Sequence, residues 1–463
     1  MRIFKFLKSK GLFFPLNLCI ACIAGFLLSP VLHHQSEHPI VYTYGIKYLL
    51  YLILLSTPLI FFLLFTFIAG SKTNRNLFLS ILFIFIALEC SLRILRPEHG
   101  FSVDAWYHTK PYVMFTGKPN SEVYGNPAMC DKGQENEPLR FGDLGFRIET
   151  KISKEKPPGE YRIMMIGGST VVGGVPLSNS IPSQIELQFH KAGFTRARVY
   201  NFGVVSYQSG QELSLLLHTL TDYRPDFVIV YNGGNDIWQP YKYDPRPDYP
   251  FNFVLFEEGF DRMRGKGQRP AQWISQQLHK SRVIRIFSKQ QLTETVLPVK
   301  QIQKQCGYGS PEWELEIVDA YIGNLEKMCK LAAGFDFRIL IILQPVAHFK
   351  TPLIGGENRL LGTNDFQLYV RRQYERTRAR FADLASRHRQ SGTCRFLDLS
   401  RVMEGYPRET FWDFIHTDNA GNRFLAEQMA RRILEMRIIP KVPALPGRAD
   451  DSRRNPGTEK APR

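Results

Sequence analysis

Short apolar runs alternate with longer amphipathic runs from Tyr161 onward, and this alternation constrains the fold more than any other feature of the chain. The apolar runs have the length of buried strands: Arg162–Ile166, Arg198–Phe202, Phe227–Tyr231, Phe337–Leu343 and Phe396–Leu399. Runs with helical spacing lie between and after them: Ile185–Lys191, Gln211–Thr221, Glu314–Ala333, Phe366–His388 and about Asn422–Met436. This order predicts an α/β domain, with a parallel sheet covered by helices on both faces.

Small or polar residues directly follow three of the predicted strands. Ser169 lies in Ile-Gly-Gly-Ser-Thr after the first strand, Gly203 ends Asn-Phe-Gly after the second, and Asn235 lies in Gly-Gly-Asn-Asp after the third. Ligands on sheets of this kind bind outside the carboxyl ends of the strands. We therefore expect Ser169, Gly203 and Asn235 to share one site at that edge.

An acid and a base lie together near the far end of the chain. Asp413 precedes His416 by three residues, so that one loop or helical turn can present both side chains to one pocket. A serine hydroxyl is a weak nucleophile until a base removes its proton, and an aspartate can fix the tautomer of that base. The alternative interpretation is a helix-capping aspartate beside a loop histidine. The serine, glycine and asparagine blocks favour the catalytic interpretation.

These four blocks, in this order, resemble the SGNH hydrolases, a branch of the GDSL esterase family named for Ser, Gly, Asn and His. The resemblance covers residues 159–438 and implies a flavodoxin-like three-layer α/β/α domain. It implies a triad of Ser169, Asp413 and His416, with no cofactor and no metal. It also implies an oxyanion hole built from the backbone amides of Ser169 and Gly203 and the side-chain amide of Asn235.

Other loops that place glycines and serine after a strand do not fit this sequence. A phosphate-binding P-loop needs a lysine that is missing after Gly173 and Gly174, and the dinucleotide fingerprint Gly-x-Gly-x-x-Gly is absent. Val171 replaces the last glycine of the Gly-x-Ser-x-Gly elbow.

Gly168 occupies the position where the SGNH family has an aspartate that is not a triad member. Further along, His348, Trp238 and Tyr241 could line the pocket, but loop and small-core positions are the commoner roles of such residues.

Three hydrophobic stretches open the chain. Residues 11–32 and 48–71 carry no charged side chain, and each is longer than the ~18–20 residues that span a bilayer. The third, residues 77–95, is interrupted by Glu89 and Arg93, which are four apart and could pair on a helix. We expect about three transmembrane helices within residues 1–96, and a retained anchor in place of a cleaved signal peptide.

Basic residues predict the orientation of this anchor. The N-terminus and the Lys72/Arg75 turn should be cytoplasmic, which places everything after residue 96 outside the cytoplasm. We therefore expect a multi-pass protein of the bacterial cytoplasmic (inner) membrane with a periplasmic catalytic domain. Without the third span, that domain would face the cytoplasm.

The charge of the chain indicates which kind of partner it has, and its cysteines indicate which disulfides it can form. The net charge of +16 comes from scattered basic residues with no interleaved stacking aromatics, which predicts an anionic envelope surface and no nucleic acid as the neighbour. In an exported domain a disulfide can persist. Three complete pairings are open to the four cysteines beyond the predicted anchor, and the sequence does not choose among them: Cys130, Cys306, Cys329 and Cys394.

At 463 residues the chain is longer than a domain of ~100–200 residues, so segments beyond the catalytic domain are expected. A polar lead-in, residues 97–158, contains the motif Gly142–Arg147. The hydrolase domain, residues 159–440, carries an aromatic- and proline-rich insertion at about 238–311. The tail, residues 441–463, has the composition of a disordered segment.

These features lead to one expected function and two alternatives. We expect a membrane-anchored, extracytoplasmic serine esterase that acts on an acylated glycan or another ester, with an O-acetyl group of an envelope glycan as its target. One alternative keeps the acyl-enzyme but transfers the acyl group to a sugar hydroxyl, which makes an O-acyltransferase that works with envelope polysaccharide machinery. The other is a non-catalytic glycan-binding component of an export machine.

Overall fold

The computed structural model describes residues 106–125, 129–130, 137–251, 299–361 and 364–439, together with a few isolated positions. No helix in these ranges is long and apolar enough to cross a membrane. The three predicted transmembrane segments and the tail beyond residue 441 lie outside the described residues, apart from isolated positions in the third segment. The anchor and the tail therefore stay predictions.

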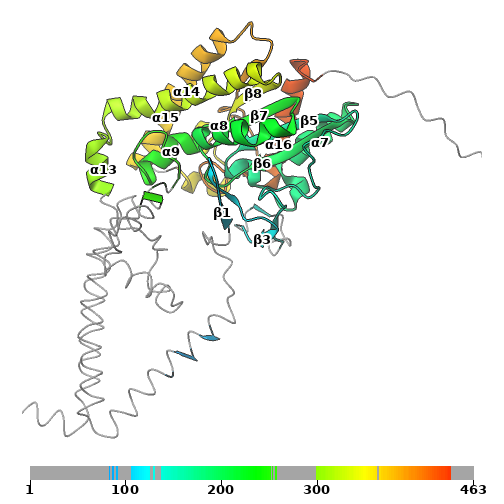
Figure 1. Ribbon diagram of the computed structural model, residues 1–463. Helices are drawn as coiled ribbons and strands as arrows, with labels where there is room; N and C mark the ends of the chain where they lie inside the picture. The colour runs from blue at the N-terminus through cyan, green and yellow to red at the C-terminus, as the bar shows by residue number, and fades with distance from the viewer. Residues whose placement is uncertain are drawn as a thin grey trace, which may run out of the picture.

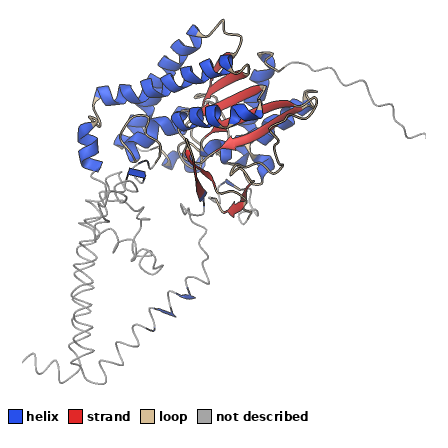
Figure 2. Cartoon of the chain, viewed as in Figure 1, coloured by secondary structure: helices blue, strands red, loops and turns tan. Residues whose placement is uncertain are grey.

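Five parallel strands form the central sheet (Figures 1 and 2). In chain order they are β5 (Tyr161–Gly167), β6 (Ala197–Gly203), β7 (Phe227–Asn232), β8 (Arg338–Leu343) and β9 (Cys394–Asp398). The spatial order β6-β5-β7-β8-β9 is the 2-1-3-4-5 order of flavodoxin-like sheets. The predicted parallel sheet and its fold class are confirmed, and only β9 begins two residues earlier than the apolar pattern indicated.

Alternate residues of the strands pack against two layers of helices, because successive side chains of a strand point to opposite faces. Ile163 and Met165 of β5 belong to one core, and Met164 and Ile166 belong to the other. The first core includes helices α7 (Ile181–Lys191) and α16 (Asn419–Glu435). Helices that pack into the second core include α8 (Ser209–His218), α14 (Pro311–Gly334) and α15 (Asp365–Arg387).

Side-chain caps define where these helices begin. Ser180, Ser310, Asn364 and Asp418 each accept a hydrogen bond from a backbone amide in the first turn of α7, α14, α15 and α16, respectively. Such caps satisfy amides that have no partner within the helix. The cap at Asp418 matters for the site, because it lies two residues after His416 and fixes the start of α16 at Asn419.

Two short helices at the carboxyl edge of the sheet were not expected. Ser169 begins the one-turn helix α6 (Ser169–Val172), and Asn235 lies in the first turn of α9 (Gly234–Lys242). A glycine pair that resembles a turn in sequence precedes α6, and another, Gly233-Gly234, lies at the start of α9. The remaining short elements are η3 (Leu177–Asn179), η4 (Leu220–Tyr223), α13 (Val299–Gln305), η5 (Ala347–Phe349) and η6 (Gly355–Arg359).

The lead-in segment packs against the sheet domain, and its described part has strands of its own. These strands form two antiparallel pairs: β1 (Tyr107–Lys110) with β2 (Met114–Gly117), and β3 (Ser121–Val123) with β4 (Leu139–Phe141). Trp106 and Phe141 share a small core with Val172 and Val175, which come directly after the predicted nucleophile. The lead-in therefore contacts the segment that carries Ser169.

Candidate active site

Close packing at two glycines positions the segment that carries Ser169. A Cβ atom at Gly203 would lie 2.7 Å from Cβ of Val171, so α6 packs directly on the end of β6. A Cβ atom at Gly168 would lie 2.5 Å from the side-chain nitrogen of Asn235. Glycine at residue 168 therefore lets Asn235 approach the residue before the nucleophile.

The structure brings Ser169, His416 and Asp413 into one hydrogen-bonded chain. Oγ of Ser169 lies 2.7 Å from Nε2 of His416, and Nδ1 of His416 lies 2.7 Å from Oδ2 of Asp413. With the proton on Nδ1 donated to Asp413, Nε2 is an acceptor for the serine hydroxyl. Residues 247 positions apart thus form the arrangement that activates a serine nucleophile.

Asp413 is held in its ionised form by the loop that presents it. Burial alone would raise the pKa of this carboxyl, but hydrogen bonds from the His416 ring and from the amides of His416 and Ile415 lower the pKa below its usual value. Those two amides donate to Oδ1 at 2.7 and 2.8 Å, respectively. Three donors therefore converge on this one carboxylate.

Trp412 completes the surroundings of His416 and was not anticipated from the sequence. Its ring stacks on the imidazole, with the centroids 4.7 Å apart and the planes 12° from parallel. The Trp412 amide also donates to the carbonyl of His416, and Phe411 and Thr417 form an antiparallel bridge at the base of this loop. A stacked aromatic face stabilises positive charge, which develops on the imidazole when it takes the serine proton.

Asn235 reaches the site from the first turn of α9. Its side-chain nitrogen donates to the carbonyl of Tyr207 at 2.7 Å, and its oxygen accepts from the indole of Trp238 at 3.0 Å. These bonds fix the amide plane and use one of its two hydrogens. The second hydrogen is the one that could serve an oxyanion, and the contact with Gly168 places the amide beside the residue that precedes Ser169.

The second predicted backbone donor, Gly203, is already engaged. Its backbone amide donates to Oδ1 of Asn201 at 3.0 Å, and the side-chain nitrogen of Asn201 donates to the carbonyl of Val171. Ser206, three residues further on, has a left-handed φ of 68° and precedes Tyr207, whose carbonyl binds Asn235. The Ser206 amide makes no hydrogen bond to any residue in the described ranges, which makes it a candidate donor that a search for glycine overlooks.

The lead-in contributes a side chain at this turn. The hydroxyl of Tyr107, on β1, donates to Oγ of Ser206 at 3.3 Å. Burial raises the pKa of Tyr107, so its hydroxyl keeps its proton at neutral pH. The turn after β6 is thus contacted by the lead-in as well as by Asn235.

Aromatic rings surround the carboxyl edge beyond Asn235. Trp238 contacts Phe414 of the Asp413–His416 loop, with ring centroids 6.0 Å apart. Tyr241 packs instead against Tyr308 of the insertion and against Phe366 and Tyr369 of α15, so it joins the insertion to the main core. His348 lies 6.0 Å from Phe414, and burial lowers its pKa to about 4. The lowered pKa makes His348 a weak base, and the hydroxyl of Ser169 is hydrogen-bonded to His416.

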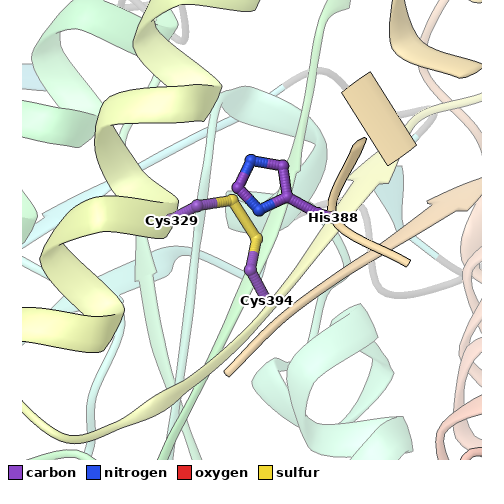
Figure 3. Close-up of side chains that lie close together, drawn as sticks. All are labelled: Cys329, His388 and Cys394. Carbon is purple, nitrogen blue, oxygen red and sulfur yellow. A yellow bond between two sulfur atoms is a disulfide. The ribbon is translucent and has the colours of Figure 1, made fainter. Parts of the chain in front are cut away.

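One cluster in the described part of the chain has the composition of a metal site, but its sulfurs are bonded to each other. Cys329 of α14 and Cys394 of β9 form a disulfide with a Cα–Cα distance of 5.4 Å, and His388 lies beside it (Figure 3). Metal ligation requires thiolates, which a disulfide does not offer. Of the four cysteines beyond the predicted anchor, the structure joins Cys329 to Cys394. Cys306 keeps its thiol, which donates to the carbonyl of Pro245, so none of the three complete pairings is formed among the described residues.

Comparisons with known proteins give structural neighbours only. No protein-family model and no curated protein matches the sequence. The fold is similar to an acetyl xylan esterase, AlAXEase, at 12% identity and a TM-score of 0.34, over 59% of this chain and 99% of the other. A catalytic mutant of Axe2, an acetylxylan esterase from Geobacillus stearothermophilus, aligns at 12% identity and a TM-score of 0.34, over 61% and 96%. A GDSL-like lipase from Bacteroides thetaiotaomicron aligns at 11% identity and 0.32, over 61% and 91%.

Proposed function

We propose that this protein is a serine hydrolase that cleaves an acyl ester through an acyl-enzyme on Ser169. The observation that carries the proposal is the pair of 2.7 Å hydrogen bonds that joins Ser169 to His416 and His416 to Asp413. The order of the site-bearing segments along the sheet supports it. Ser169, the turn after β6 and Asn235 follow the first three strands, as the resemblance to the SGNH hydrolases implies.

In the first half of the reaction, His416 takes the proton of Ser169 while Oγ attacks the ester carbonyl carbon. The imidazolium then returns that proton to the leaving alcohol, and the acyl group stays on Ser169. Water, activated by His416, hydrolyses the acyl-enzyme in the second half. Asp413 stays ionised throughout and stabilises the imidazolium, in agreement with its lowered pKa.

The tetrahedral intermediates carry a negative oxygen that needs fixed donors. Ser169 supplies the first amide of α6, which has no acceptor within the helix, and Asn235 supplies its remaining side-chain hydrogen. The backbone donor on the β6 side is Gly203 or Ser206. The engaged amide of Gly203 favours Ser206.

Substrate and location follow from the sequence and are part of the proposal. We propose that the anchor within residues 1–96 holds the enzyme in the inner membrane with its site in the periplasm. There it removes O-acetyl groups from an envelope glycan. The +16 charge supports an anionic surface as the neighbour.

The test is turnover of acetylated envelope glycan and of a simple acetate ester by the full-length protein, with Ser169→Ala as the matched variant. We expect acetate release by the wild type and none by Ser169→Ala, at an unchanged melting temperature. Acetyl transfer to a sugar hydroxyl in place of acetate release would identify an O-acyltransferase. Glycan binding without turnover of any ester, unchanged in Ser169→Ala, would refute the enzyme and favour the glycan-binding role.

A further inference from the structure

The carbonyls that follow the nucleophile, those of residues 171–175, are all held by side chains from other parts of the fold. Asn201 of β6 donates to the carbonyl of Val171 at 2.9 Å. Asn419, in the first turn of α16, donates to the carbonyl of Val175 at 2.8 Å. The last carbonyls of a helix have no partner within it, so bonds of this kind fix the end of α6 and the turn after it.

The three central carbonyls are held by one residue of the lead-in, Arg147, from the motif Gly142–Arg147. One guanidinium nitrogen donates to three consecutive carbonyls: Val172, Gly173 at 3.4 Å and Gly174 at 2.7 Å. The Arg147 side chain thus binds the last residue of α6, Val172, and the two glycines that follow it.

The environment of Arg147 is costly for a cation. The side chain is only 2% exposed, and no carboxylate of a described residue lies within ion-pair distance of it. Burial lowers its pKa to about 10, so the group is still charged at neutral pH. The carbonyls at the end of α6 and in the turn after it, together with the more distant charges of Glu149 and Glu137, offset the cost of this buried charge.

We propose that Arg147 is a positioning residue for the reaction, which holds Ser169 in register with His416 by fixing the end of α6. The inference rests on the proposed function and extends it to the lead-in. The described residues between 106 and 147 would then be part of the catalytic unit and not merely a connection to the anchor. A backbone β-bridge between Cys130 and Val175 is a second contact between the lead-in and the same turn.

A second buried arginine provides a matched control. Arg162 is fully buried and donates to two backbone carbonyls, those of Ser153 and Tyr223. It also pairs with Glu160 at 2.7 Å. Arg162 lies at the amino end of β5, and Ser169 follows the carboxyl end of the same strand. Loss of Arg162 removes a similar set of bonds far from the nucleophile.

The experiment measures the second-order rate of fluorophosphonate labelling in the full-length protein and its Arg147→Lys, Arg147→Ala and Arg162→Ala variants. Rates are taken per folded molecule, well below each melting temperature. We expect Arg147→Ala to label about 10- to 100-fold more slowly than wild type, because small displacements of a reacting group cost this much. Arg147→Lys keeps the charge but has a shorter reach, and its loss should be smaller. Arg162→Ala should lose stability but label at the wild-type rate.

Chemical rescue separates positioning from general stability. Methylguanidinium at millimolar concentration should raise the labelling rate of Arg147→Ala toward wild type and leave Arg162→Ala unchanged. Wild-type labelling by Arg147→Ala would overturn the inference. If Arg147→Ala does not fold, Arg147→Lys decides, and a wild-type labelling rate in Arg147→Lys would overturn the inference. Equal losses of labelling rate per folded molecule in Arg147→Lys and Arg162→Ala would also overturn it. Failure of the wild type to label at all would refute the proposed function instead.

Discussion

Replacement of Asp413 by asparagine should disable the base while leaving the loop intact. Three N–H donors converge on this carboxylate: the ring of His416 at 2.7 Å and the amides of His416 and Ile415 at 2.7 and 2.8 Å. Asparagine offers one oxygen. If that oxygen keeps the two backbone amides, its NH₂ group faces Nδ1 of His416 and makes Nδ1 the acceptor. The proton then moves to Nε2, and His416 cannot accept the proton of Ser169.

This reversal of the His416 tautomer determines how much activity Asp413→Asn should lose. The loss in kcat should approach about 10⁴-fold, the effect of the same change in a well-studied serine protease triad. That factor corresponds to about 5 kcal/mol of activation free energy. KM should change little, because Asp413 does not contact the substrate.

The assay is kcat on an acetate ester for Asp413→Asn beside Asp418→Asn. Asp418 caps α16 by accepting from the amide of Gly421 at 2.7 Å, and asparagine caps helices equally well. The control should keep wild-type kcat and stability. A kcat for Asp413→Asn within tenfold of wild type, with the fold intact, would refute the assignment of Asp413.

Three further predictions concern the oxyanion site, acid stability and topology. Asn235→Ala should lower kcat by about 10²–10³-fold with little change in KM, measured by steady-state kinetics. Ionised Glu357 binds Lys350 and the amides of Thr410 and Phe411, and its pKa is lowered. The stability from these bonds should therefore be lost as the pH falls below about 4.3. The melting temperature should depend less on pH in Glu357→Gln than in wild type. An alkaline phosphatase reporter should be active after residue 100 and silent at Lys72.

Each of these three has an outcome that contradicts it. Unchanged kcat in Asn235→Ala would remove that side chain from the oxyanion site. Burial raises the pKa of Glu357, but hydrogen bonds from Lys350 and from backbone amides outweigh that effect and lower it, so the stability that Glu357 contributes is lost on the acid side. An acid limb as steep in Glu357→Gln as in wild type would therefore assign the loss to other groups. A reporter active at Lys72 and silent after residue 100 would reverse the predicted orientation.

The sequence predicted the sheet well because its signals are local. Runs such as Phe227–Tyr231 are apolar and bounded by turn residues, and a strand that packs against helices on both of its faces requires that composition. The Asp413–His416 pair was predictable for the same reason, since both side chains come from one short loop.

What the sequence did not reveal depends on contacts between distant segments. Asn201 folds back to engage the amide of Gly203, so that a glycine in the expected position is not an open donor. Arg147 lies 22 residues before Ser169, and only the folded chain places its guanidinium on the turn after α6. One-turn α6 was missed because Gly-Gly-Ser-Thr also fits a turn, and four residues give no helical period to detect.

The central claim is that Ser169 is a nucleophile activated by His416. Its most direct test is intact-mass and peptide mass spectrometry of the full-length protein after reaction with a fluorophosphonate, beside the His416→Ala variant. The account predicts one adduct, on the peptide that contains Ser169, and at least 10³-fold slower modification in His416→Ala, on the order of the loss when a triad member is removed. An adduct on another residue, or equal modification of Ser169 without His416, would contradict it.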